Sequence, residues 1–202
     1  MAGLVHLLSF SKRLTSLDLS GIQRHSLTRC FQHLHSGIKR LILNDCMQVN
    51  DPALRSIVQN CPHLEELGIR YCTSLTSRAL NEAFRALGHL CVLNFSWYTN
   101  TAVDFMARSS LVSFDTLPCL VYLNLCANDL LNDTAIEMIS NHCPQLRTLD
   151  VSRCANRVAT ESFLHLQKLR HLRKLNLSCT TVSDAVLAVL AATLKLNVRL
   201  RF

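Results

Sequence analysis

Ile38-Lys-Arg-Leu41-Ile-Leu43-Asn-Asp-Cys46 is one copy of a pattern that recurs along the whole chain. Residues 64–72 and 146–154 repeat it closely and also end in cysteine, whereas the copies at 14–22, 90–98, 120–128 and 172–180 vary the last position. The central leucines are Leu17, Leu41, Leu67, Leu93, Leu123, Leu149 and Leu175, spaced 24, 26, 26, 30, 26 and 26 residues apart. This near-constant period predicts a solenoid, in which each unit packs against its neighbours.

Each unit is expected to contain one short strand and one helix. Leucines two residues apart lie on the same face of a strand, so Leu41 and Leu43 should both enter the core. Helix N-caps are predicted at Asn50, Thr76, Asn132 and Ser183, whose side-chain oxygens can accept from free amides. The helix cores are predicted to be Leu54/Ile57, Leu80/Phe84, Ile136/Ile139 and Leu187/Leu190, and Cys61-Pro62 and Cys143-Pro144 should end two of the helices.

The three copies that end in cysteine resemble the cysteine-containing subtype of leucine-rich repeat, as in the array of F-box/leucine-rich-repeat proteins. The resemblance covers essentially all 202 residues. It implies an α/β fold: a right-handed horseshoe arc of about seven repeats, with a parallel sheet on the concave face and helices on the convex face. It is more informative for fold than for function, because one fold hosts many functions.

One domain is predicted over 1–202, with 14–195 forming seven repeats and 196–202 a partial eighth strand. Residues 1–13 should be the end of a preceding repeat or a cap, because Leu4 and Leu7 keep the offsets from Leu14 that Leu54 and Ile57 keep from Leu64. Both ends are therefore expected to interrupt a repeat. An F-box, which the resemblance would place upstream of the repeats, is predicted to be absent because these thirteen residues leave no room for it.

The ten cysteines admit three interpretations: structural thiols, disulfides or metal ligands. Residues 1–10 lack a basic start and a cleavage site for export, and there is no Cys-x-x-Cys pair. Buried, reduced thiols in a cytoplasmic and/or nuclear protein are therefore favoured. His142-Cys143 places a base beside a thiol, but adjacent helical residues face different directions. With no phosphate-binding loop or hydrolase motif, neither an enzyme nor a cofactor or metal site is predicted.

The formal net charge of +7 raises the question of nucleic acid binding. Most basic residues are spread over the repeats, and the local cluster is Lys168, Arg170, Arg173 and Lys174 with His165 and His171. Phe163, the aromatic ring near it, fits the helix core instead of a base-stacking role. A solvated rim is therefore favoured, and nucleic acid is not the predicted partner. A membrane span is not predicted, because the apolar run 185–194 is about half the length needed.

The concave face is the predicted site for a protein partner. Arg70, Tyr71, Trp97 and Tyr122 are expected to lie close together there, and these residue types are frequent binding hot spots. The remaining candidate residues on the same face are Arg40, Asp150, Arg153 and Lys174. Alternatively, Trp97 folds over the sheet edge or fills a gap beside Tyr98, which replaces the usual cysteine. The longer fourth repeat, near residues 99–116, is interpreted as an outer insertion or as a site-forming loop.

These features predict a protein-binding scaffold. The resemblance implies the substrate-recognition part of an SCF-type (F-box/LRR) ubiquitin ligase, which would hold a target on its concave face for ubiquitin-dependent protein catabolism. Contact with the cullin-ligase adaptor is expected only from a longer form that carries an F-box. The alternative is a structural or inhibitory leucine-rich-repeat scaffold outside any ligase.

Overall fold

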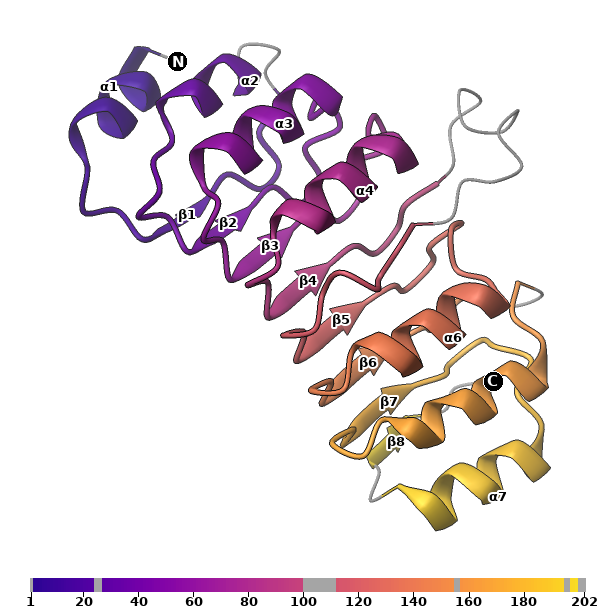
Figure 1. The fold of residues 1–202 in the computed structure, drawn as a ribbon. Coiled ribbons are helices and arrows are strands. Elements are labelled where there is room, and N and C mark those ends of the chain that lie inside the picture. The colour runs from indigo at the N-terminus through magenta and orange to yellow at the C-terminus, as the bar shows by residue number, and fades with distance from the viewer. Residues whose placement is uncertain (1, 24–26, 100–111, 155–156, 195–196, 200–202) are drawn as a thin grey trace.

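Eight short parallel strands form one sheet, in the order in which they occur in the chain (Figure 1). The computed structural model describes residues 2–23, 27–99, 112–154, 157–194 and 197–199. The strands are β1 (Ser16–Asp18), β2 (Arg40–Ile42), β3 (Glu66–Gly68), β4 (Val92–Asn94), β5 (Tyr122–Asn124), β6 (Thr148–Asp150), β7 (Lys174–Asn176) and β8 (Asn197–Arg199). β8 lies inside the segment predicted as a partial eighth strand.

Strand register places all the central leucines in one row across the sheet. Leu17 pairs with Leu41, Leu41 with Leu67, and the row continues in this way to Leu175. Backbone hydrogen bonds between repeats extend beyond the strands, for example from Leu43 N to Gly68 O at 2.7 Å. The repeat period read from the sequence therefore corresponds to the physical stacking of one unit on the next.

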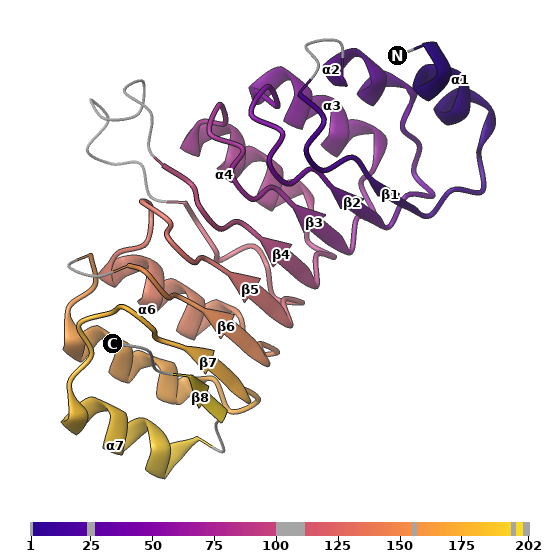
Figure 2. The same ribbon diagram turned by 180° about the vertical axis from the view of Figure 1, so that it is seen from behind.

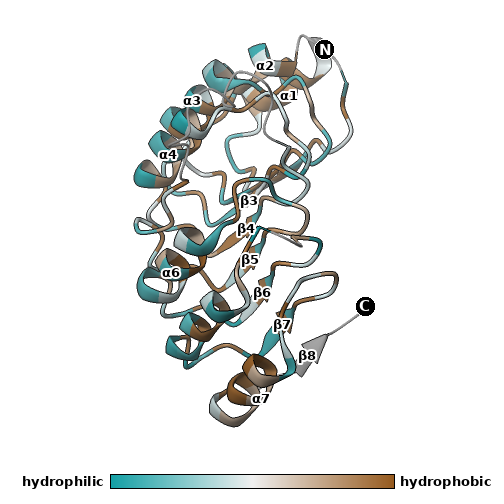
Figure 3. Ribbon diagram, turned by 90° about the vertical axis from the view of Figure 1, so that its right-hand side faces the viewer, coloured by the Kyte–Doolittle hydropathy of each residue, from teal (hydrophilic) through white to brown (hydrophobic). Residues whose placement is uncertain are grey.

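Helices cover the outer side of the arc, and the strands follow its inner side (Figures 1 and 2). Viewed from the side, the sheet and the helices form two separate layers (Figure 3). The helices are α1 (Ala2–Phe10), α2 (Leu27–Cys30), α3 (Asp51–Asn60), α4 (Ser77–Ala86), α6 (Asp133–His142) and α7 (Asp184–Thr193), with 3₁₀ segments η1 (Phe31–His33) and η2 (Thr160–Lys168). The predicted arrangement, with the sheet inside and the helices outside, is confirmed.

All four predicted N-caps are confirmed. The side chains of Asn50, Thr76, Asn132 and Ser183 each accept from the backbone N–H three residues later. Each bond satisfies one of the amides that a helix start leaves without an intrahelical partner. The cap residues therefore fix where the outer helices begin.

Helix starts are also joined from one repeat to the next. Asp51, the first residue of α3, accepts from Thr76 N at 2.9 Å and from the Thr76 hydroxyl at 2.7 Å. Asp133 at the start of α6 likewise accepts from Ala159 N at 2.7 Å, just before η2. These acidic residues, which interact favourably with the helix dipole, thus also hold neighbouring repeats together.

The apolar core runs between the two layers for the length of the described arc. Leu41 and Leu43 are fully buried, as predicted. Helix residues Leu54, Ile57, Leu80, Phe84, Ile136, Ile139 and Leu190 are also buried. Burying such side chains supplies most of the stabilisation, since no single repeat can cover its own apolar face.

In the two terminal helices, the buried residue lies one position away from the residue that the sequence predicted. Leu7 is 45% exposed, and Leu8 is the buried residue of α1. In α7 the buried partner of Leu190 is Val186, whereas Leu187 is half-buried. In both helices the apolar run is nearly continuous, so spacing alone does not determine which side faces inward.

Within the described residues, no helix combines the length and apolar character needed to cross a bilayer. The prediction of an insertion near 99–116 falls mainly on residues 100–111, which lie outside the described residues.

Candidate partner-binding surface

One backbone position per repeat, directly after the strand, has a positive φ. These residues form the turn row: Gly21, Asp45, Tyr71, Trp97, Ala127, Arg153 and Cys179, with φ between 52° and 73°. Most of them donate their backbone N–H to the next repeat, as Tyr71 N does to Ser96 O at 3.0 Å and Trp97 N to Cys126 O at 2.7 Å. The turn row therefore carries its side chains in single file along one edge of the sheet.

Aromatic and basic side chains meet within the turn row. The guanidinium carbon of Arg153 lies 5.7 Å from the centroid of the Trp97 ring, within cation–π range. Ala127 occupies the repeat between them, and its small side chain leaves room for this contact. Tyr71 and Trp97 remain 37% and 39% exposed. The turn row thus presents two aromatic surfaces and one oriented cation.

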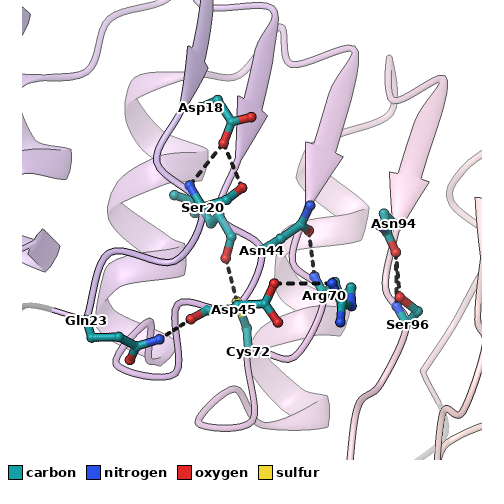
Figure 4. A network of polar contacts seen from close by, with 10 residues as sticks. Asp18, Ser20, Gln23, Asn44, Asp45, Arg70, Cys72, Asn94 and Ser96 are labelled. Atoms are coloured by element: carbon teal, nitrogen blue, oxygen red, sulfur yellow. Dashed lines mark hydrogen bonds and ion pairs between the residues drawn. The ribbon is translucent and has the colours of Figure 1, made fainter.

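Short polar bridges stiffen the backbone just before the turn row (Figure 4). Asn94 Oδ1 accepts from the Ser96 hydroxyl at 2.8 Å and from Ser96 N at 3.3 Å. Asp18 holds Ser20 in the same way, and the Ser20 hydroxyl followed by the Ser20 N–H lowers the pKa of the Asp18 carboxyl. The same bridge recurs between Asp150 and Ser152, so this pattern orders the strand ends.

Two of the candidate arginines form ion pairs across adjacent repeats. Arg70 Nη1 lies 3.3 Å from Asp45 Oδ2, and the Arg70 backbone N–H donates to Asn44 Oδ1 at 3.0 Å (Figure 4). Arg40 Nε lies 3.0 Å from Glu66 Oε2. Exposed pairs of this kind contribute less than about 1 kcal/mol each, so their main effect is to fix side-chain direction and neutralise charge.

The concave face contains an open hollow of about 420 Å³ over β1 to β5. Arg40, Glu66, Val92 and Tyr122 line it, and Gly68 lies among them. A Cβ at Gly68 would come within 3.0 Å of side-chain atoms of Ile42 and Asn44, so the backbone lies close beneath both. The missing side chain lowers the floor of this hollow.

Residues 168–191 match the family model described as Leucine Rich repeat. F-box protein SKIP19 of Arabidopsis thaliana is 31% identical over 128 residues, which is 61% of this chain and 39% of that protein. F-box/LRR-repeat protein 4 of Bos taurus is 31% identical over 121 residues, which is 60% of this chain and 19% of that protein. The chain thus spans well under half of either relative.

Among solved structures, internalin C2 from Listeria monocytogenes has a similar fold, with a TM-score of 0.68 and 22% sequence identity. The alignment covers 98% of this chain and 74% of the internalin chain. The fold is a leucine-rich-repeat solenoid. Its repeat array resembles that of the F-box/LRR proteins, as the cysteine-ended copies suggested.

The leucine-rich-repeat solenoid separates the predicted site residues into different rows. Tyr122 pairs with Val92 and Thr148 at the start of the strands, in a row that also holds Arg40 and Lys174. Five extended residues separate this row from the turn row, on the order of 15 Å. The expectation that Tyr122 lies beside Trp97 is therefore wrong, because they share a face but occupy opposite ends of the strands.

The remaining candidates fall between these two rows or join one of them. Tyr71, Trp97 and Arg153 belong to the turn row, with Arg70 one residue before it. Asp150 lies at the end of β6, where its carboxylate accepts from Ser152 and from Asn176 Nδ2 at 2.8 Å. Arg153 was placed on the concave face from the sequence, but its contact with Trp97 two repeats away was not foreseen.

The position after the turn row explains both the cysteines and Tyr98. Cys46 and Cys72 donate their S–H to carbonyls of the preceding repeat at 3.1 and 3.2 Å, and Asn128 donates to Phe95 O from the same position. Tyr98 is 1% exposed and its hydroxyl donates to Leu75 O at 2.6 Å. Tyr98 thus fills this inner position, and Trp97 is left on the surface beside it.

Six of the ten cysteines are buried, but Cys119 and Cys179 are exposed, contrary to the prediction that the thiols are buried. Cys119 lies in the segment before β5, as Cys61 lies before β3, but Cys119 is open to solvent. His142 is exposed whereas Cys143 is fully buried, and burial raises the pKa of the Cys143 thiol to about 12. A thiol in that environment is not an activated nucleophile.

Proposed function

We propose that this chain binds a protein partner through its concave face and turn row, as the substrate-recognition part of an SCF-type ubiquitin ligase in the cytoplasm or nucleus. The observation that carries this proposal is the 31% identity to two relatives named as F-box proteins, over about 60% of the chain. Binding without chemistry of its own fits the fold, and the partner's ubiquitination would depend on another subunit.

The turn row supports the proposal because it offers a compact group of hot-spot residue types. Tyr71 and Trp97 are adjacent in the row, and each keeps more than a third of its surface exposed. Arg153 is held over the Trp97 ring, so less side-chain entropy is lost when a partner covers it. The ordered backbone beneath these residues presents them in a fixed geometry.

The decisive experiment compares tagged forms of the natural full-length product in its own cells. The wild-type protein should co-purify with a cullin adaptor and with a set of partners that accumulates when the proteasome is inhibited. The double variant Tyr71→Ala/Trp97→Ala should retain the adaptor and lose about 30-fold or more in affinity for its main partner, the loss typical of one strong hot spot.

Phe10→Ala is the matched control, because Phe10 is also an exposed aromatic residue but lies on α1, away from the turn row. It should leave partner capture unchanged. Partner capture without any adaptor would reject the ligase assignment and favour a non-ligase scaffold. Unchanged partner binding by the double variant would reject the turn row as the site.

A further inference from the structure

Positive charge is concentrated at one end of the arc. Residues 146–194 contain seven Lys or Arg and three Asp or Glu, so about a quarter of the chain carries four of its seven net positive charges. Earlier repeats balance their charges at the corresponding edge: Lys39 Nζ lies 3.1 Å from Glu65 Oε1, and Arg40 pairs with Glu66. The charge imbalance therefore arises in the sixth and seventh repeats.

Strand register brings the basic residues of these two repeats together. Arg147 O accepts from Arg173 N at 2.9 Å and from Lys174 N at 3.0 Å, so these three residues are neighbours at the start of β6 and β7. Arg170 belongs to the return just before β7 and is exposed, as the other three are. These four residues, Arg147, Arg170, Arg173 and Lys174, are called the basic rim.

The charges of the basic rim are not neutralised within the described part of the chain. None of the four side chains forms an ion pair with a described carboxylate, although six such pairs occur elsewhere in that part. Asp150, the acidic residue nearest in sequence to Arg147, accepts from Ser152 and Asn176 instead. Like charges held side by side raise the free energy of the rim, and an anionic partner would relieve this repulsion.

Arg173 is also held in place. Its Nη1 donates to Arg170 O at 3.2 Å and to Leu172 O at 3.0 Å, which anchors the guanidinium against the return. A guanidinium has five N–H donors, so others remain for a carboxylate, which it can bind in bidentate geometry. Arg173 is therefore oriented before any partner arrives.

We infer that the basic rim binds an acidic segment of the same protein partner that the concave face holds; this inference rests on the proposed function. Lys174 shares its row with Thr148 and Tyr122, so the rim is continuous with the concave face. A peptide fits better than a nucleic acid, because Phe163 is the one Phe, Tyr or Trp between 146 and 194 and it is fully buried. The rim therefore lacks a surface on which bases could stack.

The test uses the purified 202-residue chain and a fluorescein-labelled peptide of about 12 residues that alternates Glu and Ser, with Gln replacing Glu in a neutral control. Fluorescence anisotropy should show that the Glu peptide binds and the Gln peptide does not. Binding of the Glu peptide should weaken as the salt concentration rises from roughly 50 to 250 mM. The triple variant Arg147→Glu/Arg173→Glu/Lys174→Glu should raise its Kd by about tenfold or more.

The matched control, Lys12→Glu/Arg13→Glu/Arg85→Glu, makes the same change in net charge with exposed residues far from the rim and should change Kd less than about twofold. If circular dichroism shows that the rim variant with three Glu substitutions does not fold, a rim variant with Gln at the same three positions replaces it. Equal binding of the Gln peptide, or equal losses in both triple variants, would refute the inference. So would tighter binding of a single-stranded DNA oligonucleotide that depends on the rim.

Failure here is distinguishable from failure of the proposed function. If the full-length product captures no adaptor while the acidic peptide still binds through the rim, the ligase assignment is wrong and the rim assignment stands. If the peptide does not bind while the Tyr71→Ala/Trp97→Ala variant still loses its partner, the rim assignment alone is wrong.

Discussion

At the scale of single residues, the turn row demands a backbone conformation that most side chains disfavour. Six of its seven members are not glycine, although a left-handed conformation costs a non-glycine residue about 1–2 kcal/mol. Each member follows the central leucine of its repeat by four positions, so counting from the leucines locates it. The pattern did not reveal the sign of φ, because Gly21 is the one glycine in the row and only Asp45 among the others is a residue type enriched in the left-handed region.

Gly21→Ala should destabilise the protein by about 1 kcal/mol in urea unfolding, because φ is +73° there. Gly88→Ala is the matched control, since an added Cβ meets nothing within 4 Å at either position and Gly88 is not in the left-handed region. Gly88→Ala should be neutral or slightly stabilising. Equal effects of the two substitutions would contradict a strained turn row.

At the scale of helices and strands, local chemistry predicted the element starts well. Asn50, Thr76, Asn132 and Ser183 cap the helices expected from them, because a cap depends on residues within one turn. Which residues of α1 are buried was not predictable in the same way, since no described capping residue precedes Leu4 to fix the start of the helix. Which side of such a helix faces inward is decided by packing against α2 and η1.

Asp51→Ala should cost about 2 kcal/mol, because it leaves Thr76 N without its acceptor and breaks the link between two helix starts. Asp184→Ala is the control: Asp184 also begins a helix, α7, but its loss should remove only the dipole interaction, about 0.5 kcal/mol. Chemical denaturation of both variants measures the difference. Similar losses would mean that the bridge from Asp51 adds nothing to the stacking of repeats.

At the scale of the whole molecule, the order of the strands followed from the repeat period, and the arc followed from the resemblance to leucine-rich repeats. The binding surface followed only in part. The sequence identified the residues on the concave face, but not that Tyr122 and Trp97 lie at opposite ends of their strands or that Arg153 reaches across Ala127. Such contacts depend on the sizes of side chains in different repeats, which a repeat consensus does not encode.

The stability of the whole solenoid should fall at high pH because of its buried thiols. Burial raises the pKa of Cys72 to about 12 and of Cys61 to about 11, from 9.0 for an ordinary thiol. Because the folded state keeps these protons longer than the unfolded chain, their contribution is complete below about pH 9 and is lost as pH rises toward 11–12.

Urea unfolding at about pH 8 and 10.5 measures this loss. Cys72→Ala should show a smaller loss than the wild type, whereas Cys179→Ala, which removes an exposed thiol, should show the full loss. An unchanged pH dependence in Cys72→Ala would mean that this thiol does not resist ionisation in the folded state.

The regular spacing of the turn row also matches the residue spacing of an extended peptide laid along it. Neighbouring strands lie about 4.8 Å apart, whereas an extended peptide advances about 3.3 Å per residue. Two steps of the row therefore match three residues of the peptide to within about 0.5 Å. Side chains alternate between the two faces of an extended strand, so residues six apart in such a partner would meet row positions four repeats apart, such as Asp45 and Arg153.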